Sequence, residues 1–318
     1  MGRGGQEEPG AGALDLSGGM RRGDRVAGLI KRIPDRELSE ALHAALPHID
    51  PADLKTIELL AKAASNPRYR ELNERLGAEP LERHSELARV GGRRPEAYVL
   101  TASEEALRKL SGRRGTTPGG GEWQIRGVNV DLPSGESVIA LAPDEAERAA
   151  RGEISPTLVH ELIHATQAPP GFLYGFDDEA TEADAAAAAE LLCEGATEAL
   201  TELRTGSVDG TYVAERAAIA EILADAEDVE AALEELSAAD WGDRAMLVAE
   251  RLFGGAEHEP AVWDIATAYR IKALELEVND PRGTSAERRN ELKPQLRRIM
   301  RGLIAQAKDE AAGAAQPG

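Results

Sequence analysis

A change of pattern at Ser155 is the feature that most constrains how this chain folds. From Ser155 onward the sequence predicts helices alone, at about 156–168, 178–204, 211–237, 240–253, 260–278 and 285–310. The second of these contains five consecutive alanines, the residue with the highest helix propensity. Strand patterns occur only upstream, so any sheet must be small and must precede the helical array.

The strand patterns lie between residues 97 and 141. Residues 97–101 predict one short strand, and residues 128–132 and 137–141 flank a Pro-Ser-Gly-Glu turn that predicts a β-hairpin. Residues 24–90 predict helices, since Leu54, Ile57 and Leu60 recur at the spacing of a buried stripe. The predicted fold class is therefore α+β and mostly helical.

The same patterns divide the chain into segments. We expect disordered tails at 1–20 and 311–318, a helical N-terminal region at 21–95, a core at 96–204 and a helical C-terminal subdomain at 205–310. The last predicted helix is basic, and we expect it to lie against the acidic part of the chain.

Charge is concentrated in one segment. The 318 residues carry a net charge of −20, and residues 177–259 hold 23 acidic and 4 basic side chains, a net of −19. Such acidity disfavours nucleic-acid binding. Two interpretations remain, solvated helix faces or an acidic cleft that favours cationic substrates.

The predicted cellular location rests on the absence of targeting and membrane-spanning patterns from the sequence. The sequence has no signal peptide and no apolar run long enough to cross a membrane. Its single cysteine, Cys193, cannot form an intrachain disulfide. We expect a cytoplasmic protein, with export that needs no cleaved signal as the alternative.

The most informative run is Ser155-Pro-Thr-Leu-Val-His-Glu-Leu-Ile-His, an HExxH motif on a helix. Ser155 is a good N-cap residue, and proline suits the first helical position. His160 and His164 lie one turn apart on the same face, so both imidazoles can bind one metal ion. Glu161 lies at the edge of that face and can take a proton from a metal-bound water.

A third ligand is expected from the next helix. Glu194 and Glu198 are four residues apart and share a face, and Gly195 would allow this helix to approach the HExxH helix closely. Either glutamate can be the ligand, and Asp177 or Asp178 is a further alternative. A metzincin is excluded, because Gln167 and Pro170 replace the required glycine and histidine, and Cys193 is interpreted as a buried helix residue.

The HExxH motif followed by Glu194-Gly-Ala-Thr-Glu198 resembles the gluzincin metallopeptidases over about residues 155–204. The resemblance implies a zincin-like core in 96–204 and a zinc ion bound by His160, His164 and Glu194. It also implies that Glu161 is the general base and that Glu198 orients His160. Gluzincins add a side chain that stabilises the oxyanion, and we prefer Tyr269 over the candidates Tyr212, Tyr174, His258 and Arg270.

The predicted function is hydrolysis of peptide or protein substrates by a zinc-dependent metallopeptidase, with an exported effector or toxin protease of the same chemistry as the alternative. The hairpin at 128–141 would offer a strand edge to an extended substrate, or be an ordinary edge strand. Basic peptides are the favoured substrates. The competing hypothesis is a helical interaction protein whose metal site is structural or vestigial. His43, His48 and His84 lack ligand spacing and are interpreted as surface histidines.

Overall fold

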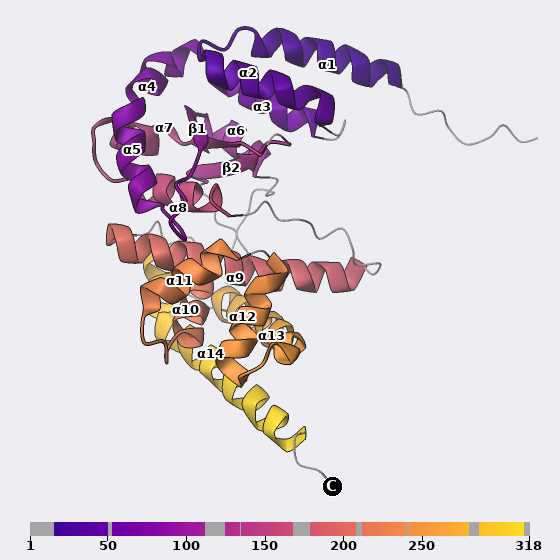
Figure 1. Ribbon diagram of the computed structural model, residues 1–318, viewed down its shortest axis with the longest axis vertical. Coiled ribbons are helices and arrows are strands. Elements are labelled where there is room, and N and C mark those ends of the chain that lie inside the picture. Colours follow the sequence, from indigo (N-terminus) through magenta and orange to yellow (C-terminus); the bar gives the residue numbers. More distant parts are fainter. Residues whose placement is uncertain are drawn as a thin grey trace, which may run out of the picture.

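A computed structural model describes residues 16–49, 53–111, 125–133, 135–167, 179–207, 212–239, 241–279 and 286–314. Within these residues the chain is mostly helical and contains one three-stranded sheet, as predicted. Figure 1 shows the sheet and the N-terminal helices at one end of the molecule, and the C-terminal helices at the other.

The sheet has the strand order β1–β3–β2, formed by β1 (Ala97–Thr101), β3 (Ser137–Leu141) and β2 (Gly127–Asp131). Strand β3 pairs in parallel with β1 and antiparallel with β2, which confirms the predicted hairpin. All five residues of β3 are buried, because both faces of the sheet are covered. Ile139 and Leu141 belong to one hydrophobic core, while Val138 and Ala140 belong to the other.

The N-terminal helices cover one face of the sheet. This layer is built by α1 (Leu16–Ile30), α2 (Arg36–Ala45), α3 (Leu54–Ala64) and α6 (Glu104–Leu110). The predicted stripe is buried, with Ile57 and Leu60 in the core of this layer. The other face packs on α8 (Pro156–His164), and around it lie α4 (Arg70–Arg75), α5 (Ala78–Leu87) and α7 (Pro143–Ala150).

Helix α9 (Glu179–Thr205) runs beneath α8 and leads into the C-terminal half (Figure 1). The other helices there are α10 (Val213–Ile222), α11 (Val229–Ala238), α12 (Trp241–Phe253), α13 (Glu259–Val278) and α14 (Ala286–Ala314). Residues 211–237 do not form the single predicted helix. The chain turns after Leu223, and the side chain of Asp228 starts α11 by accepting the N–H of Ala231 at 3.0 Å.

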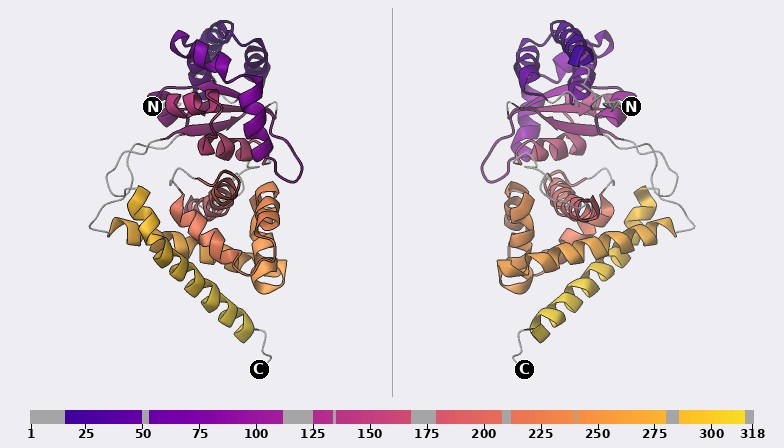
Figure 2. Two further views of the ribbon diagram at one scale, coloured as in Figure 1. Left: turned by 90° about the vertical axis from the view of Figure 1, so that its left-hand side faces the viewer. Right: turned by 90° about the vertical axis from the view of Figure 1, so that its right-hand side faces the viewer.

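The basic helix α14 lies against α10, as expected, and extends away from the other helices toward the C-terminus (Figure 2). The buried carboxylate of Glu221 on α10 accepts hydrogen bonds from Arg297 and from Arg301, the latter at 2.8 Å. These contacts hold the pKa of Glu221 below its usual value, although burial, the largest effect, opposes the shift. Part of the acidity is therefore balanced within the fold.

The structure corrects three predictions of local structure. Helix α1 begins at Leu16 and α14 continues to Ala314, so residues 16–20 and 311–314 are helical although they fall in the segments expected to be disordered. Helix α7 was not predicted, although Pro143 occupies its first turn.

None of the helices in the described part of the chain combines the length and apolar character that a membrane crossing requires.

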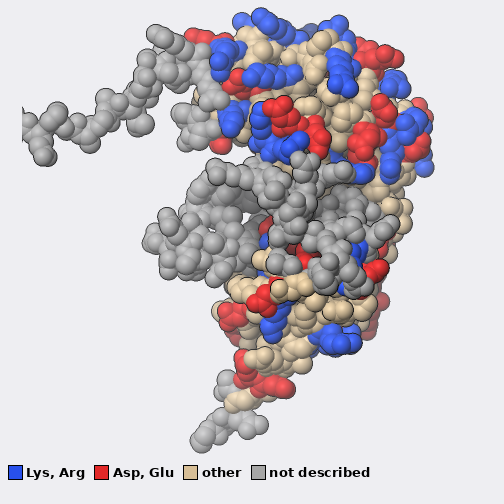
Figure 3. Space-filling view, turned by 180° about the vertical axis from the view of Figure 1, so that it is seen from behind, with Lys and Arg blue, Asp and Glu red and all other residues tan. Residues whose placement is uncertain are grey.

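Charges of both signs are mixed on one face of the N-terminal half. In the view of Figure 3, Lys and Arg side chains alternate there with Asp and Glu, without a continuous patch of one sign. This distribution agrees with the near balance of charge outside residues 177–259.

Candidate metal centre

The HExxH motif lies on α8, whose start is fixed by its own sequence. The Ser155 hydroxyl oxygen accepts the N–H of Leu158 at 3.0 Å, and Pro156 occupies the first turn. Leu158 and Leu162 are buried in the core below. The predicted cap is thus confirmed, and the cap and these buried leucines fix which face of α8 is turned toward α9.

Buried polar groups from other elements also bind Ser155 at the start of α8. The Ser155 hydroxyl donates to Glu145 at 2.7 Å, and the Ser155 N–H donates to Nε2 of His84 at 3.0 Å. His84 is fully buried, so its interpretation as a surface histidine is wrong. Its Nδ1 lies 2.6 Å from the carbonyl oxygen of Pro80, which can only accept, so the ring is neutral with its proton on Nδ1.

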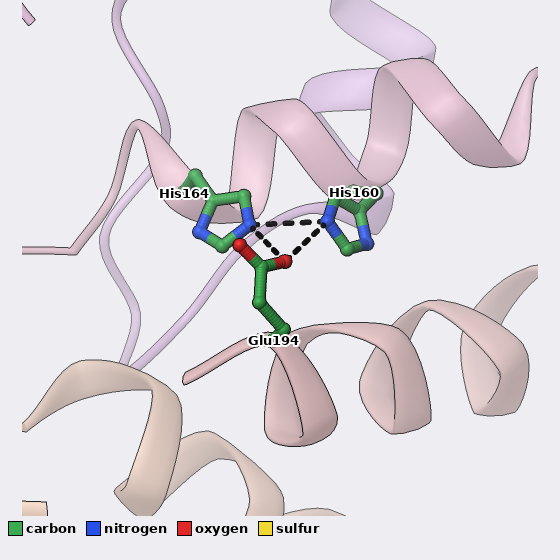
Figure 4. Close-up of side chains that lie close together, drawn as sticks. All are labelled: His160, His164 and Glu194. Atoms are coloured by element: carbon green, nitrogen blue, oxygen red, sulfur yellow. Dashed lines mark hydrogen bonds and ion pairs between the residues drawn. The ribbon is translucent and has the colours of Figure 1, made fainter. Parts of the chain in front are cut away.

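His160, His164 and Glu194 meet between α8 and α9 (Figure 4). The two Nε2 atoms are 3.0 Å apart, and Oε2 of Glu194 lies 3.2 Å from each of them. All three side chains are largely buried. Three atoms that can each offer a lone pair therefore form a nearly equilateral triangle.

Such a triangle needs a positive charge, because lone pairs at these distances repel one another. Without a cation the charge comes from protons. Burial is the largest influence on His160 and favours the neutral ring, but hydrogen bonds to Glu194 and Glu198 raise the pKa of His160 to about 10. The charges of the two rings lower the pKa of Glu194 well below its usual range, against the effect of burial.

The donor set and its spacing fit a zinc ion. Two histidines and one glutamate are a known set of protein ligands for catalytic zinc, with a water in the remaining position. Around a tetrahedral ion with bonds of about 2.0–2.1 Å, ligand atoms lie about 3.3 Å apart. The observed separations of 3.0, 3.2 and 3.2 Å are close to that value.

The outer nitrogen of each imidazole also has a partner. Nδ1 of His160 lies 3.1 Å from Oε2 of Glu198, in the orienting position that the resemblance implies. Glu194, not Glu198, contacts both Nε2 atoms. Nδ1 of His164 lies 3.0 Å from Oε1 of Gln167, a contact that the HExxH spacing does not predict.

Glu161 lies against strand β2. A Cβ atom on Gly127 would lie 2.8 Å from Cγ of Glu161 and 2.8 Å from Cγ2 of Thr157, so only glycine allows this approach. The backbone N–H of Asn129 donates to the Glu161 carboxylate. Burial is the largest effect on this carboxyl and raises its pKa, against the charges of the two histidines and this hydrogen bond.

Tyr269, the preferred oxyanion residue, does not join this cluster. It is fully buried on α13, and its hydroxyl donates to the carbonyl oxygen of Ala214 at 2.6 Å. Burial raises the pKa of this hydroxyl. The buried face of α13 thus directs Tyr269 into the helical core, and its oxyanion role stays a prediction.

The other candidates for the oxyanion residue and for the third ligand lie at different positions in the fold. The ring of Tyr212 stacks on His160, with 5.5 Å between centroids and an interplanar angle of 1°. Arg270 forms ion pairs with Glu190 at 3.1 Å and with Glu215 at 3.3 Å, and His258 packs beside Phe253. Tyr174, Asp177 and Asp178 lie outside the described residues.

Gly195 allows a close helix approach, but to a different helix than predicted. A Cβ atom there would lie 2.7 Å from the carbonyl oxygen of Glu215 and 2.7 Å from Cγ1 of Ile219, both on α10. The face of α9 that bears Glu194 and Glu198 is turned toward α8, so Gly195 points elsewhere. Cys193 is half-buried, with Sγ 3.2 Å from Oε1 of Gln167.

Comparison of the chain with protein-family models, with curated proteins and with solved structures found no match.

Proposed function

We propose that this chain is a zinc-dependent peptidase with a zincin-like core. The observation that carries the proposal is the triangle of His160, His164 and Glu194, placed beside the buried carboxylate of Glu161. When bound, zinc would polarise the substrate carbonyl and lower the pKa of a water. His160, His164 and Glu194 would hold the ion, with Glu198 orienting His160.

Glu161 is the proton acceptor in this proposal. Burial raises the pKa of its carboxyl, which makes its carboxylate a stronger base than an exposed glutamate. It takes a proton from the attacking water and passes it to the leaving amine nitrogen when the peptide bond breaks. The N–H of Asn129 and the close backbone of Gly127 fix its position.

A peptide substrate is favoured by the edge of β2. On either side of β2, the N–H of Ala142 donates to the carbonyl oxygen of Arg126 and the N–H of Leu132 donates to the carbonyl oxygen of Glu136, both at 2.7 Å. Because hydrogen-bonding residues alternate along an antiparallel strand, the even-numbered residues of β2 direct their backbone groups toward β3. The backbone groups of Gly127 and Asp131 and the carbonyl group of Asn129 then point outward, while the N–H of Asn129 donates to Glu161. No strand in the described part of the chain pairs with that edge. An extended peptide bound there by main-chain hydrogen bonds would pass within reach of Glu161.

Basic peptides are the proposed preferred substrates. The helix that supplies Glu194 belongs to the segment with a net charge of −19, and such a field attracts cations. The preference should shrink as salt screens the charges.

Substitution of the general base tests the proposal. We expect Glu161→Gln to bind one zinc per chain and to cleave unstructured peptides about 10²–10⁴-fold more slowly than the wild type. Zinc is measured by metal analysis and cleavage by mass spectrometry. Glu71→Gln, an exposed change on α4, is the control.

Two results would contradict this function. Wild-type cleavage by a zinc-loaded Glu161→Gln protein removes Glu161 from the mechanism. A wild-type protein that holds zinc but cleaves no peptide favours the structural metal site of an interaction protein.

A further inference from the structure

Gln167 lies in a tight turn directly after α8. The helix ends at His164, and the N–H of Ala165 donates to the carbonyl oxygen of Glu161 at 3.1 Å. The N–H of Gln167 donates to the carbonyl oxygen of His164 at 3.0 Å. This last bond spans three residues and tightens the chain beyond the helix end. The side chain of Gln167 is thereby brought beside the ring of His164.

The Gln167 amide is held at both ends. Oε1 lies 3.0 Å from Nδ1 of His164 and 3.2 Å from the thiol of Cys193. Nε2 donates to the hydroxyl oxygen of Thr197 on α9 at 2.8 Å, and Thr197 is fully buried. The amide therefore connects the ring of His164 on α8 to α9, independently of Glu194.

These contacts determine which ring nitrogen carries the proton. An amide oxygen can only accept, so Nδ1 of a neutral His164 must be protonated to bond with it. Nε2 then has a free lone pair, and it is Nε2 that faces His160 and Glu194. A histidine that binds a metal through Nε2 needs this tautomer.

We propose that Gln167 is the positioning residue of His164 and that Thr197 anchors it. The inference rests on the zinc site proposed above. Gln167 does for His164 what Glu198 does for His160, but without a negative charge. Gln167 and Glu198 would together orient the two imidazole rings, while only Glu198 adds a negative charge to the site.

Zinc affinity of the purified full chain tests the role, measured by competition with a chromogenic chelator. We expect Gln167→Leu to bind Zn²⁺ about 10–100-fold more weakly than the wild type, because the ring loses its acceptor. Thr197→Val should weaken binding less, since the amide remains. Gln295→Leu, an exposed change on α14, should leave affinity unchanged.

Rescue separates hydrogen bonding from packing. Gln167→Glu retains an acceptor for Nδ1–H, and the Thr197 hydroxyl can donate to it, so affinity should stay within a few-fold of the wild type. NMR of the zinc-loaded protein should show the Nδ1 proton of His164 protected from exchange in the wild type and in Gln167→Glu, and exchanging rapidly in Gln167→Leu.

Each possible failure has its own meaning. Wild-type affinity in folded Gln167→Leu overturns the role of Gln167 and leaves the metal site intact. Equal losses in Gln167→Leu and Gln167→Glu show that accepting the Nδ1 proton is not what the side chain contributes, which also overturns it. A wild-type chain that takes up no zinc removes the metal site and this inference together. If Gln167→Leu does not fold, Thr197→Val decides, and unchanged affinity there counts against the proposal.

Discussion

Single residues in the run Glu194-Gly-Ala-Thr-Glu198 have separate roles because a helix turns by about 100° per residue. Glu194 contacts both histidines, and Glu198, one turn on, contacts the outer nitrogen of His160. Thr197 bonds to Gln167, while Gly195 packs on α10. The shared face of the two glutamates follows from spacing. The partners of Gly195 and Thr197 come from other elements, so spacing did not reveal them.

At Gly127, the addition of a single methyl group should already affect catalysis. In Gly127→Ala the new methyl group would overlap Glu161 and Thr157, and overpacking of this kind costs about 1–3 kcal/mol. The displaced carboxylate should lower kcat about 10²-fold, while the zinc ligands remain in place. Peptide cleavage and zinc content are measured together.

A matched glycine provides the control for this change. A Cβ atom on Gly302 of α14 would have no neighbour within 4 Å, so Gly302→Ala should leave activity unchanged. Full activity of Gly127→Ala would mean that Glu161 tolerates displacement, contrary to its proposed role.

Among the elements, α8 shows how a helix with its own start signal still depends on distant groups. Ser155 caps the helix, as its sequence predicts, but Glu145 and His84 hold Ser155 in turn. The hairpin upstream supplies the strand that touches Glu161. Strands β1 and β3 match their predicted ranges, because each contains a short, continuous run of apolar residues. Strand β2 begins one residue earlier than predicted.

The His84 contact predicts acid sensitivity. Burial, the largest effect, lowers the pKa of His84, so the folded protein binds this proton less readily than the unfolded chain, whose histidines titrate near about 6.5. The stability that neutral His84 contributes is complete above that pH and is lost as the pH falls below it. Losing the bond to the Ser155 N–H would cost about 1–3 kcal/mol.

Urea unfolding between about pH 5 and 8 measures this effect. The free energy of unfolding of the wild type should fall more steeply with acidification than that of His84→Gln. His43→Gln, at an exposed position on α2, should retain the wild-type slope. Identical slopes in wild type and His84→Gln would show that the ring is not held neutral.

At the scale of the whole molecule, α9 joins the half that contains the sheet to the helical half. Near its end, Arg204 donates to the carbonyl oxygen of Leu87 at 3.1 Å and forms ion pairs with Glu230 and Glu234 of α11. Earlier in α9, Glu194 meets the two histidines of α8. A metal ion there would connect the two halves at a second point.

Metal should therefore stabilise the whole fold. Free zinc at about 100 times its Kd adds about 2.7 kcal/mol to the free energy of unfolding of a protein that binds it only when folded. We expect zinc to raise the Tm of the wild type and a chelator to reverse the rise, as followed by calorimetry. The Tm of His164→Ala should not respond, whereas His258→Ala should behave as the wild type. An equal rise in His164→Ala would place the zinc elsewhere.

The sequence by itself determined features that depend on residues within about one helical turn or one hairpin. These include the fold class, the strands, the cap of α8, and the common face of His160 and His164 and of Glu194 and Glu198. Only the tertiary structure decided that Glu194 meets both rings, that Tyr269 is buried, and that Gly127 and Gln167 lie beside the site. Local backbone hydrogen bonds and side-chain periodicity act between near neighbours, whereas a packing partner is chosen by the shape of the entire core.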